Sequence, residues 1–231
     1  MRTDKRGFGL ASGLFLLLAG VGVARGADAP SPATMAPREE YMIADRSDEI
    51  ALARSAAPAS IADDAGVLVL GARGYETAAQ SANGFVCLVE RAWESGFDHP
   101  DFWNPRVRGP LCMNPAAVRS VLPGTLERAQ WALSGVSLAG MRERSRTSAR
   151  ANMAPAPGAM SFMLSKQGYL SGAHGHWHPH LMFFSPDKPG EWGADGAHSP
   201  VLSAPGAGRF TLFFVPLMEW SDGTPADMSG H

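Results

Sequence analysis

The chain has 231 residues, of which 20 are basic and 22 acidic, and its formal net charge is −2. This balance argues against a nucleic-acid partner, because binding to phosphates requires a concentrated positive field. The length and the hydrophobic content of 45% suffice for one well-built core.

The first 26 residues have the features of a signal peptide. Arg2, Lys5 and Arg6 form a basic head, residues 7–23 are apolar and uncharged, and small residues precede Ala27. We therefore expect cleavage before Ala27 and export to the periplasm or the extracellular space. An uncleaved anchor is the alternative, but a run of about 17 apolar residues is at the short limit for crossing a bilayer. Cleavage leaves 16 basic and 21 acidic residues, a net charge of about −5, and no later segment of the sequence is apolar enough to span a membrane.

The mature chain is predicted to start with a flexible leader, residues 27–46, which is rich in Ala, Pro and Ser. A single domain, residues 47–231, follows. Its first helix is expected to be capped by Ser47 or Asp48 and to end at Pro58.

Glycine-bounded runs of β-branched and apolar residues predict the first two strands, 65–71 and 84–92. The second run is apolar on both faces, which is typical of a central strand covered on both sides. The next stretch, 94–115, is dense in Pro, Gly and Asp and predicts an irregular loop.

Two helices are expected next, because Asn114 and Thr125 are each followed by a helical pattern of apolar residues. The basic stretch 141–150 is interpreted as a solvated helix end and linker. Three further apolar runs of strand length follow at 160–166, 180–185 and 210–217. This order of elements predicts a single α+β domain, with a mainly antiparallel sheet of about five strands and helices packed on one face.

Four histidines alternate along the sequence "SGAHGHWHPHLMFF": His174, His176, His178 and His180. In an extended segment alternate side chains project to one face, about 6.7 Å apart, so two imidazoles can converge on one metal. Further ligands could come from His99, His198, Asp187 or Glu191. Imidazole-rich sites suit Zn, Cu or Ni, so a transition metal is the cofactor that this run favours.

A second interpretation of the histidine run is a solvated loop, because Gly175 and Pro179 interrupt it. Uncoordinated imidazoles there would titrate near pH 6.5 without a function. His180 begins an apolar run and is compatible with a structural histidine bonded to the backbone. A cupin-type centre is disfavoured, because Met182 and Phe183 stand where that family has a glutamate.

Cys87 and Cys112 are the two cysteines of the chain. In an oxidising compartment the pair predicts a disulfide that closes a loop of 25 residues. The alternative is that both are small buried apolar side chains. Ser137 lies between glycines but lacks the spacing of a hydrolase elbow, and no catalytic acid–base pair can be assigned.

The elements "NGFVCLVERAW", "SFMLSKQGYLS", "PHLMFF" and "FFVPLMEWSDGT" resemble those of a family of exported bacterial proteins that carry no assigned activity. The resemblance extends over residues 49–225. It implies that His180 belongs to the shared framework, whereas His174, His176 and His178 are local additions, and it transfers no catalytic role to any residue.

Two functional hypotheses follow from the sequence. The first is an exported, non-catalytic domain that binds a small ligand or a protein partner. The second is a transition-metal-binding protein or metalloenzyme that uses the cluster from His174 to His180.

Overall fold

The computed structural model describes residues 32–170, 178–194, 196, 199, 201–206 and 210–226. Within these residues the chain forms one mixed α+β unit around a single sheet of eight strands. The strands are β1 (Gly66–Gly71), β2 (Gly74–Ala79), β3 (Val86–Glu90), β4 (Gly109–Met113), β5 (Met160–Met163), β6 (His180–Ser185), β7 (Leu202–Pro205) and β8 (Thr211–Pro216).

The strands are arranged in the order β2-β1-β3-β4-β5-β6-β8-β7. Strands β1 and β3 run parallel, and each of the other neighbouring pairs in this described sheet is antiparallel. The mainly antiparallel α+β architecture expected from the sequence is therefore confirmed. All five predicted strands are present, as β1, β3, β5, β6 and β8.

The sheet has more strands than the five expected, because the sequence pattern did not predict β2, β4 and β7. Strand β2 and strand β7 lie at the two edges, where a strand is paired on one side and needs little apolar sequence. Strand β4 lies inside the segment interpreted as an irregular loop, and all five of its residues are buried. Its Pro110 lacks a backbone N–H, but β5 pairs only with Cys112 and Met113, so the sheet does not require that donor.

Three of the five described helices begin where a polar side chain accepts from a free backbone N–H group. Asp45 accepts from Ser47 N at 2.7 Å and Asn114 accepts from Ala117 N at 2.9 Å, so the second cap is the one predicted and the first lies two residues earlier. The helices are α1 (Arg46–Arg54), α2 (Ala59–Ala62), α3 (Pro115–Ser120), α4 (Leu122–Leu133) and α5 (Leu138–Thr147), with 3₁₀ turns η1 (Arg38–Tyr41), η2 (Ala92–Glu94) and η3 (Pro189–Trp192).

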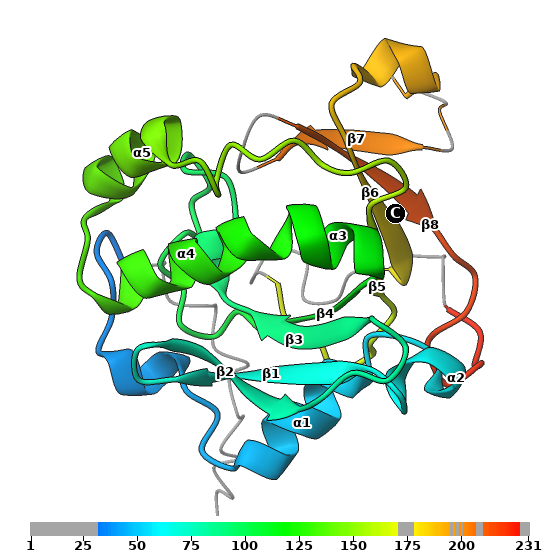
Figure 1. Ribbon diagram of the computed structural model, residues 1–231, viewed down its shortest axis with the longest axis horizontal. Coiled ribbons are helices and arrows are strands. Elements are labelled where there is room, and N and C mark those ends of the chain that lie inside the picture. Colours follow the sequence, from blue (N-terminus) through cyan, green and yellow to red (C-terminus); the bar gives the residue numbers. More distant parts are fainter. Residues whose placement is uncertain are drawn as a thin grey trace, which may run out of the picture.

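Helices cover both faces of the sheet, which corrects the expectation that they lie on one (Figure 1). One face of β3, with Cys87 and Val89, packs against α1 and α2. The opposite face, with Leu88, packs against α3 and the start of α4. Because side chains alternate along a strand that is apolar on both faces, each face requires its own helical cover.

A third apolar cluster includes residues of α4 and α5, and half of its ten buried side chains are aromatic. Tyr41 packs on Trp93 with ring centroids 4.9 Å apart, and Phe102 packs edge-on against Trp103 at 4.7 Å. The Tyr41 hydroxyl donates to Trp103 O at 2.7 Å. Tyr41 is fully buried, so the packed part of the chain begins within the segment 27–46 that the sequence pattern assigned to the leader.

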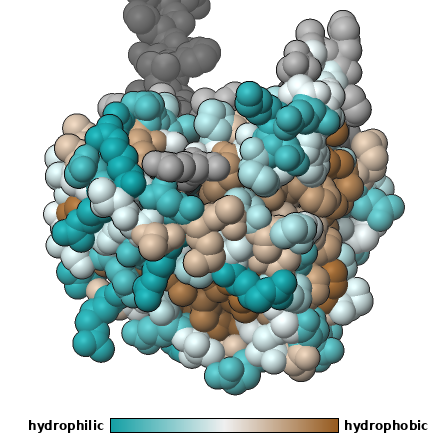
Figure 2. All heavy atoms as spheres, turned by 45° about the horizontal axis from the view of Figure 1, so that its top comes forward, coloured by the Kyte–Doolittle hydropathy of each residue, from teal (hydrophilic) through white to brown (hydrophobic). Residues whose placement is uncertain are grey.

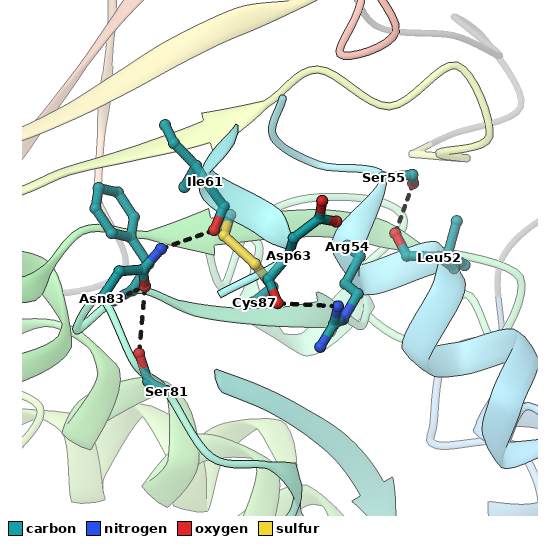
Figure 3. Close-up of a disulfide and its surroundings, with 10 residues drawn as sticks. Leu52, Arg54, Ser55, Ile61, Asp63, Ser81, Asn83 and Cys87 are labelled. Atoms are coloured by element: carbon teal, nitrogen blue, oxygen red, sulfur yellow. Dashed lines mark hydrogen bonds between the residues drawn. A yellow bond between two sulfur atoms is a disulfide. The ribbon is translucent and has the colours of Figure 1, made fainter. Parts of the chain in front are cut away.

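The predicted disulfide joins Cys87 of β3 to Cys112 of β4 (Figure 3). The two residues are directly opposite each other in the register of the two strands, and both are fully buried. Near this bridge Asn83 donates to Ile61 O at 2.8 Å and Arg54 donates to Asp63 O at 3.2 Å. The first bond links α2 to the segment before β3, and the second links the end of α1 to the end of α2.

Candidate ligand-binding site

The structure places only part of the histidine run. His174, His176 and His198 lie outside the described residues. His180 is the first residue of β6 and is buried, and its Nδ1 donates to His178 O at 2.7 Å. Burial lowers the pKa of His180 to about 4, so the ring is neutral at physiological pH. Its ring packs edge-on against Phe214, with centroids 5.4 Å apart.

His99 lies on the surface, and its Nδ1 accepts from Asp101 N at 3.1 Å. Asp187 and Glu191 each have local partners: Asp187 accepts from Ser185 Oγ at 2.7 Å, and Glu191 accepts from Lys188 N at 2.7 Å. Across the part of the chain that the structure describes, no three His, Cys, Asp or Glu side chains are grouped closely enough to hold a metal.

A cavity of about 100 Å³ lies between the α3–α4 segment and the outer strands of the sheet, and it opens to solvent. Its apolar wall is formed by Val121, Met153, Met182, Phe184, Phe210 and Leu212. Its polar wall includes Glu90, Glu94 and Arg128, with Arg150 at the exposed rim. In the view that turns the top of Figure 1 forward, apolar surface gathers in patches between hydrophilic atoms (Figure 2).

Two glutamates line the cavity from the end of a covered strand and the 3₁₀ turn after it. Glu90 is the last residue of β3, and Glu94 is the last residue of η2, which begins two residues later at Ala92. Burial raises the pKa of Glu90 to about 7 and that of Glu94 to about 8. The Arg128 guanidinium opposes both shifts, and the charge of Glu90 adds to the shift of Glu94. At pH 7 the Glu94 carboxyl is therefore mostly protonated, and the Glu90 carboxyl is about half protonated.

Arg128 projects from α4 into the same wall and is 3% exposed. Its Nη2 donates to Trp93 O and to Ser95 O, the latter at 2.9 Å. Its guanidinium lies over the Phe97 ring, 4.6 Å from the centroid. Nε and Nη1 have no hydrogen-bond partner among the described residues, and neither does the buried Glu94 Oε1. None of the ion pairs formed by described residues involves Arg128.

Another buried arginine, Arg91, shows what a structural role requires. It donates to Tyr41 O at 2.7 Å, to Val89 O at 2.5 Å and to Glu49 Oε1 at 2.8 Å. Glu49 Oε1 also accepts from Leu70 N at 3.1 Å. All three nitrogens of Arg91 have partners, and its charge is neutralised by a direct ion pair. Arg128 has neither property, although both arginines are almost completely buried.

The sequence pattern did not predict the cavity, although it contains one usable signal. Glu90 ends an apolar run that was predicted to be covered on both faces, and an acid there requires either solvent or compensation. Arg128 carried no comparable signal, because it lies on a helix where arginine is common. The outer wall comes from β6 and β8, and nothing in the sequence links these strands to α4.

Comparison of this chain with protein-family models, with curated proteins and with solved structures found no match. In the described residues, no helix has both the length and the apolar character needed to cross a bilayer. The fold and the cavity are therefore the basis for any functional conclusion.

Proposed function

We propose that this protein is an exported domain that binds a small ligand in the cavity between α3–α4 and the outer strands. The signal-like N-terminus and the Cys87–Cys112 disulfide support a periplasmic or extracellular location, because disulfides persist in oxidising compartments. The resemblance to exported bacterial proteins supports the same location.

One observation carries the binding proposal. Arg128 and Glu94 line the cavity, and their Arg128 Nε, Arg128 Nη1 and Glu94 Oε1 atoms are buried without hydrogen-bond partners among the described residues. A buried polar group without a hydrogen bond costs about 1–3 kcal/mol, and more when it is charged. A bound molecule that supplies these hydrogen bonds recovers that free energy, and the apolar wall opposite adds contact area.

Binding without catalysis fits the cavity better than a hydrolytic reaction. The Ser120 hydroxyl donates to Ala116 O at 2.8 Å and accepts from Ala156 N at 2.9 Å, so it serves to hold the chain. Protonated carboxyls can serve as general acids. Protonated carboxyls can also donate hydrogen bonds to a ligand. Binding of this kind needs no nucleophile, whereas hydrolysis does.

The proposal can be tested with the untagged mature chain, residues 27–231, labelled with ¹⁵N. Amide shifts would be recorded against a library of small carboxylates, amines, alcohols and amides. We expect at least one class to perturb amides around Glu90, Glu94 and Arg128, and Arg128→Met to abolish the effect. Arg144→Met, which removes an exposed arginine of α5, is the matched control. Binding that maps to another surface, or that is unchanged in Arg128→Met, would refute the assignment.

The second candidate function is transition-metal binding by His174, His176, His178 and His180, with Zn, Cu or Ni as the ion. Two of these histidines lie outside the described residues, so the structure adds no observation in favour of this candidate. Its test is the metal content of the untagged mature chain after passage over a chelator. One ion per chain, lost in the double variant His176→Ala and His178→Ala, would support it, and weak binding of several ions would not.

A further inference from the structure

We propose that the ligand of the cavity is a small organic monocarboxylate, with its carboxylate on Arg128 and its apolar body against Met182, Phe184 and Leu212. This inference rests on the proposed binding function and names the ligand class. It follows from three features of the cavity: a buried cation without a direct ion pair among the described residues, the hydrogen-bonding groups beside it and the apolar side chains that also line the cavity.

The first feature is the charge of Arg128. Arg128 is almost completely buried and forms no ion pair among the described residues, although the nearby Glu94 and Glu90 favour its charged form. Isolated buried charges are strongly unfavourable, and charge-assisted bonds to a carboxylate are about twice as strong as neutral ones. An anion is the ligand that neutralises this cation, whereas an amine would place a second positive charge beside it.

The second feature is the protonation of the neighbouring carboxyls. Burial holds Glu94 in its acid form at neutral pH, and a carboxylic acid can donate an O–H bond to an incoming carboxylate. Arg128 and Glu94 then both act as donors toward one anion. A neutral alcohol could accept from Arg128, but it would leave the guanidinium charge uncompensated.

The third feature is the size and character of the cavity. Its volume of about 100 Å³ is of the order of the ~150 Å³ apolar cavity that holds benzene. Met182 and Phe184 are buried on the wall opposite the charged groups, and Leu212 is half-buried beside them. A second charge on the ligand would have to lie against these side chains, so a dicarboxylate is disfavoured. A compact aryl or branched aliphatic acid fits best.

The test uses three probes that share one ring, namely benzoate, benzyl alcohol and benzylamine. Each would be titrated into the ¹⁵N-labelled mature chain at pH 6.0, with the Kd taken from amides that line the cavity. We expect benzoate to bind at least ten-fold more tightly than either of the others. Arg128→Met should remove this preference, Arg128→Lys should keep part of it, and Arg144→Met should leave it unchanged.

The affinity for benzoate should also fall as the pH rises from 6 to 9. The carboxyl groups on the cavity wall are those of Glu90 and Glu94, and the basic side chains there are Arg128 and Arg150. Tyr75 lies nearby and remains neutral, because burial raises its pKa well above 10. Ionisation of the glutamates places negative charge beside the bound anion. Glu94→Gln removes one such charge, so its Kd for benzoate should change less across this pH range.

Two sets of results would overturn the inference and would also separate its failure from that of the binding proposal. If benzyl alcohol or benzylamine matches or exceeds benzoate at the cavity amides, the site binds ligands but the carboxylate assignment is wrong. If no probe and no library compound perturbs those amides, both proposals fail. If Arg128→Met does not fold, Arg128→Lys and Glu94→Gln still give a decision, because an unchanged benzoate preference and an unchanged pH profile in both variants refute the role of these residues.

Discussion

Glu94 has a buried carboxyl oxygen without a partner among the described residues, and burial raises its pKa to about 8. The folded state therefore retains a proton that the unfolded chain releases near pH 4.5. Between these pH values the folded state binds more protons, so this group destabilises the fold increasingly as the pH rises from about 4.5 to about 8. Glu90 acts in the same direction up to about pH 7.

We predict that Glu94→Gln raises the free energy of unfolding at pH 9 and leaves it nearly unchanged at pH 4. The amide cannot ionise, so it escapes the cost of burying a charge at high pH, and at low pH it resembles the protonated acid. Urea unfolding at the two pH values measures the difference. Glu219→Gln, at an exposed position, is the control and should show no such pH dependence. A variant that is less stable than the wild type at pH 9 would contradict the prediction.

The effect of pH on His180 is opposite to its effect on Glu94, because burial lowers the pKa of His180 to about 4. The unfolded state takes up a proton near pH 6.5 and the folded state does not, so stability is complete above pH 6.5 and is lost as the pH falls toward 4. The shift corresponds to roughly 3 kcal/mol. We predict that His180→Asn, which can still donate to His178 O, removes this part of the acid sensitivity. Chemical unfolding between pH 7 and pH 4 tests this, with the exposed His99→Asn as the control.

At the scale of the elements, the ion pair between Glu49 of α1 and Arg91 fixes the helix against the sheet. Its N–O distance is 2.8 Å, and both side chains are at most 3% exposed. We predict that Glu49→Gln lowers the free energy of unfolding by about 3–5 kcal/mol, because the buried guanidinium loses its counter-charge. Arg146→Met breaks the exposed pair with Glu143 and should change stability very little. Equal effects of the two substitutions in thermal or urea unfolding would count against this role of the buried pair.

The elements that were predicted from the sequence are those whose own residues determine them. Asn114 followed by Pro115 specifies a helix start locally, and strand β3 is apolar enough to be recognised on its own. Strand β4 forms because β3 offers it an antiparallel edge, so its existence depends on a neighbour rather than on its own sequence. The two helical layers were missed for a related reason. The face that a helix covers depends on the path of the loops, which a local pattern does not record.

At the scale of the whole molecule, the cavity depends on contacts between distant parts of the chain. Arg128 and Phe184 are 56 positions apart in the printed sequence, and both line it. Local sequence patterns cannot bring such residues together, so the candidate site could not be predicted. The histidine run was conspicuous because it is local, yet its described members are a buried structural His180 and a half-buried His178. The local periodicity of the sequence therefore predicted most strands and helices of this protein, but not its cavity.

The disulfide acts on the whole molecule, because it constrains the unfolded chain as well as joining β3 to β4. It closes a loop across a sequence separation of 25 residues, which corresponds to about 3 kcal/mol of stabilisation. We predict that the double variant Cys87→Ala and Cys112→Ala loses at least this amount, since two buried side chains also become smaller. Urea unfolding of the mature chain gives the difference.

The reduced wild type provides a second measurement. Wild type that is unfolded and refolded with a reductant should lose a similar amount of free energy of unfolding. Reductant added to the native protein should act slowly, because both sulfurs are inaccessible until the core opens. If the reduced wild type proved as stable as the oxidised protein, the bridge would contribute nothing to the fold, and the argument from the oxidising compartment would lose its structural support.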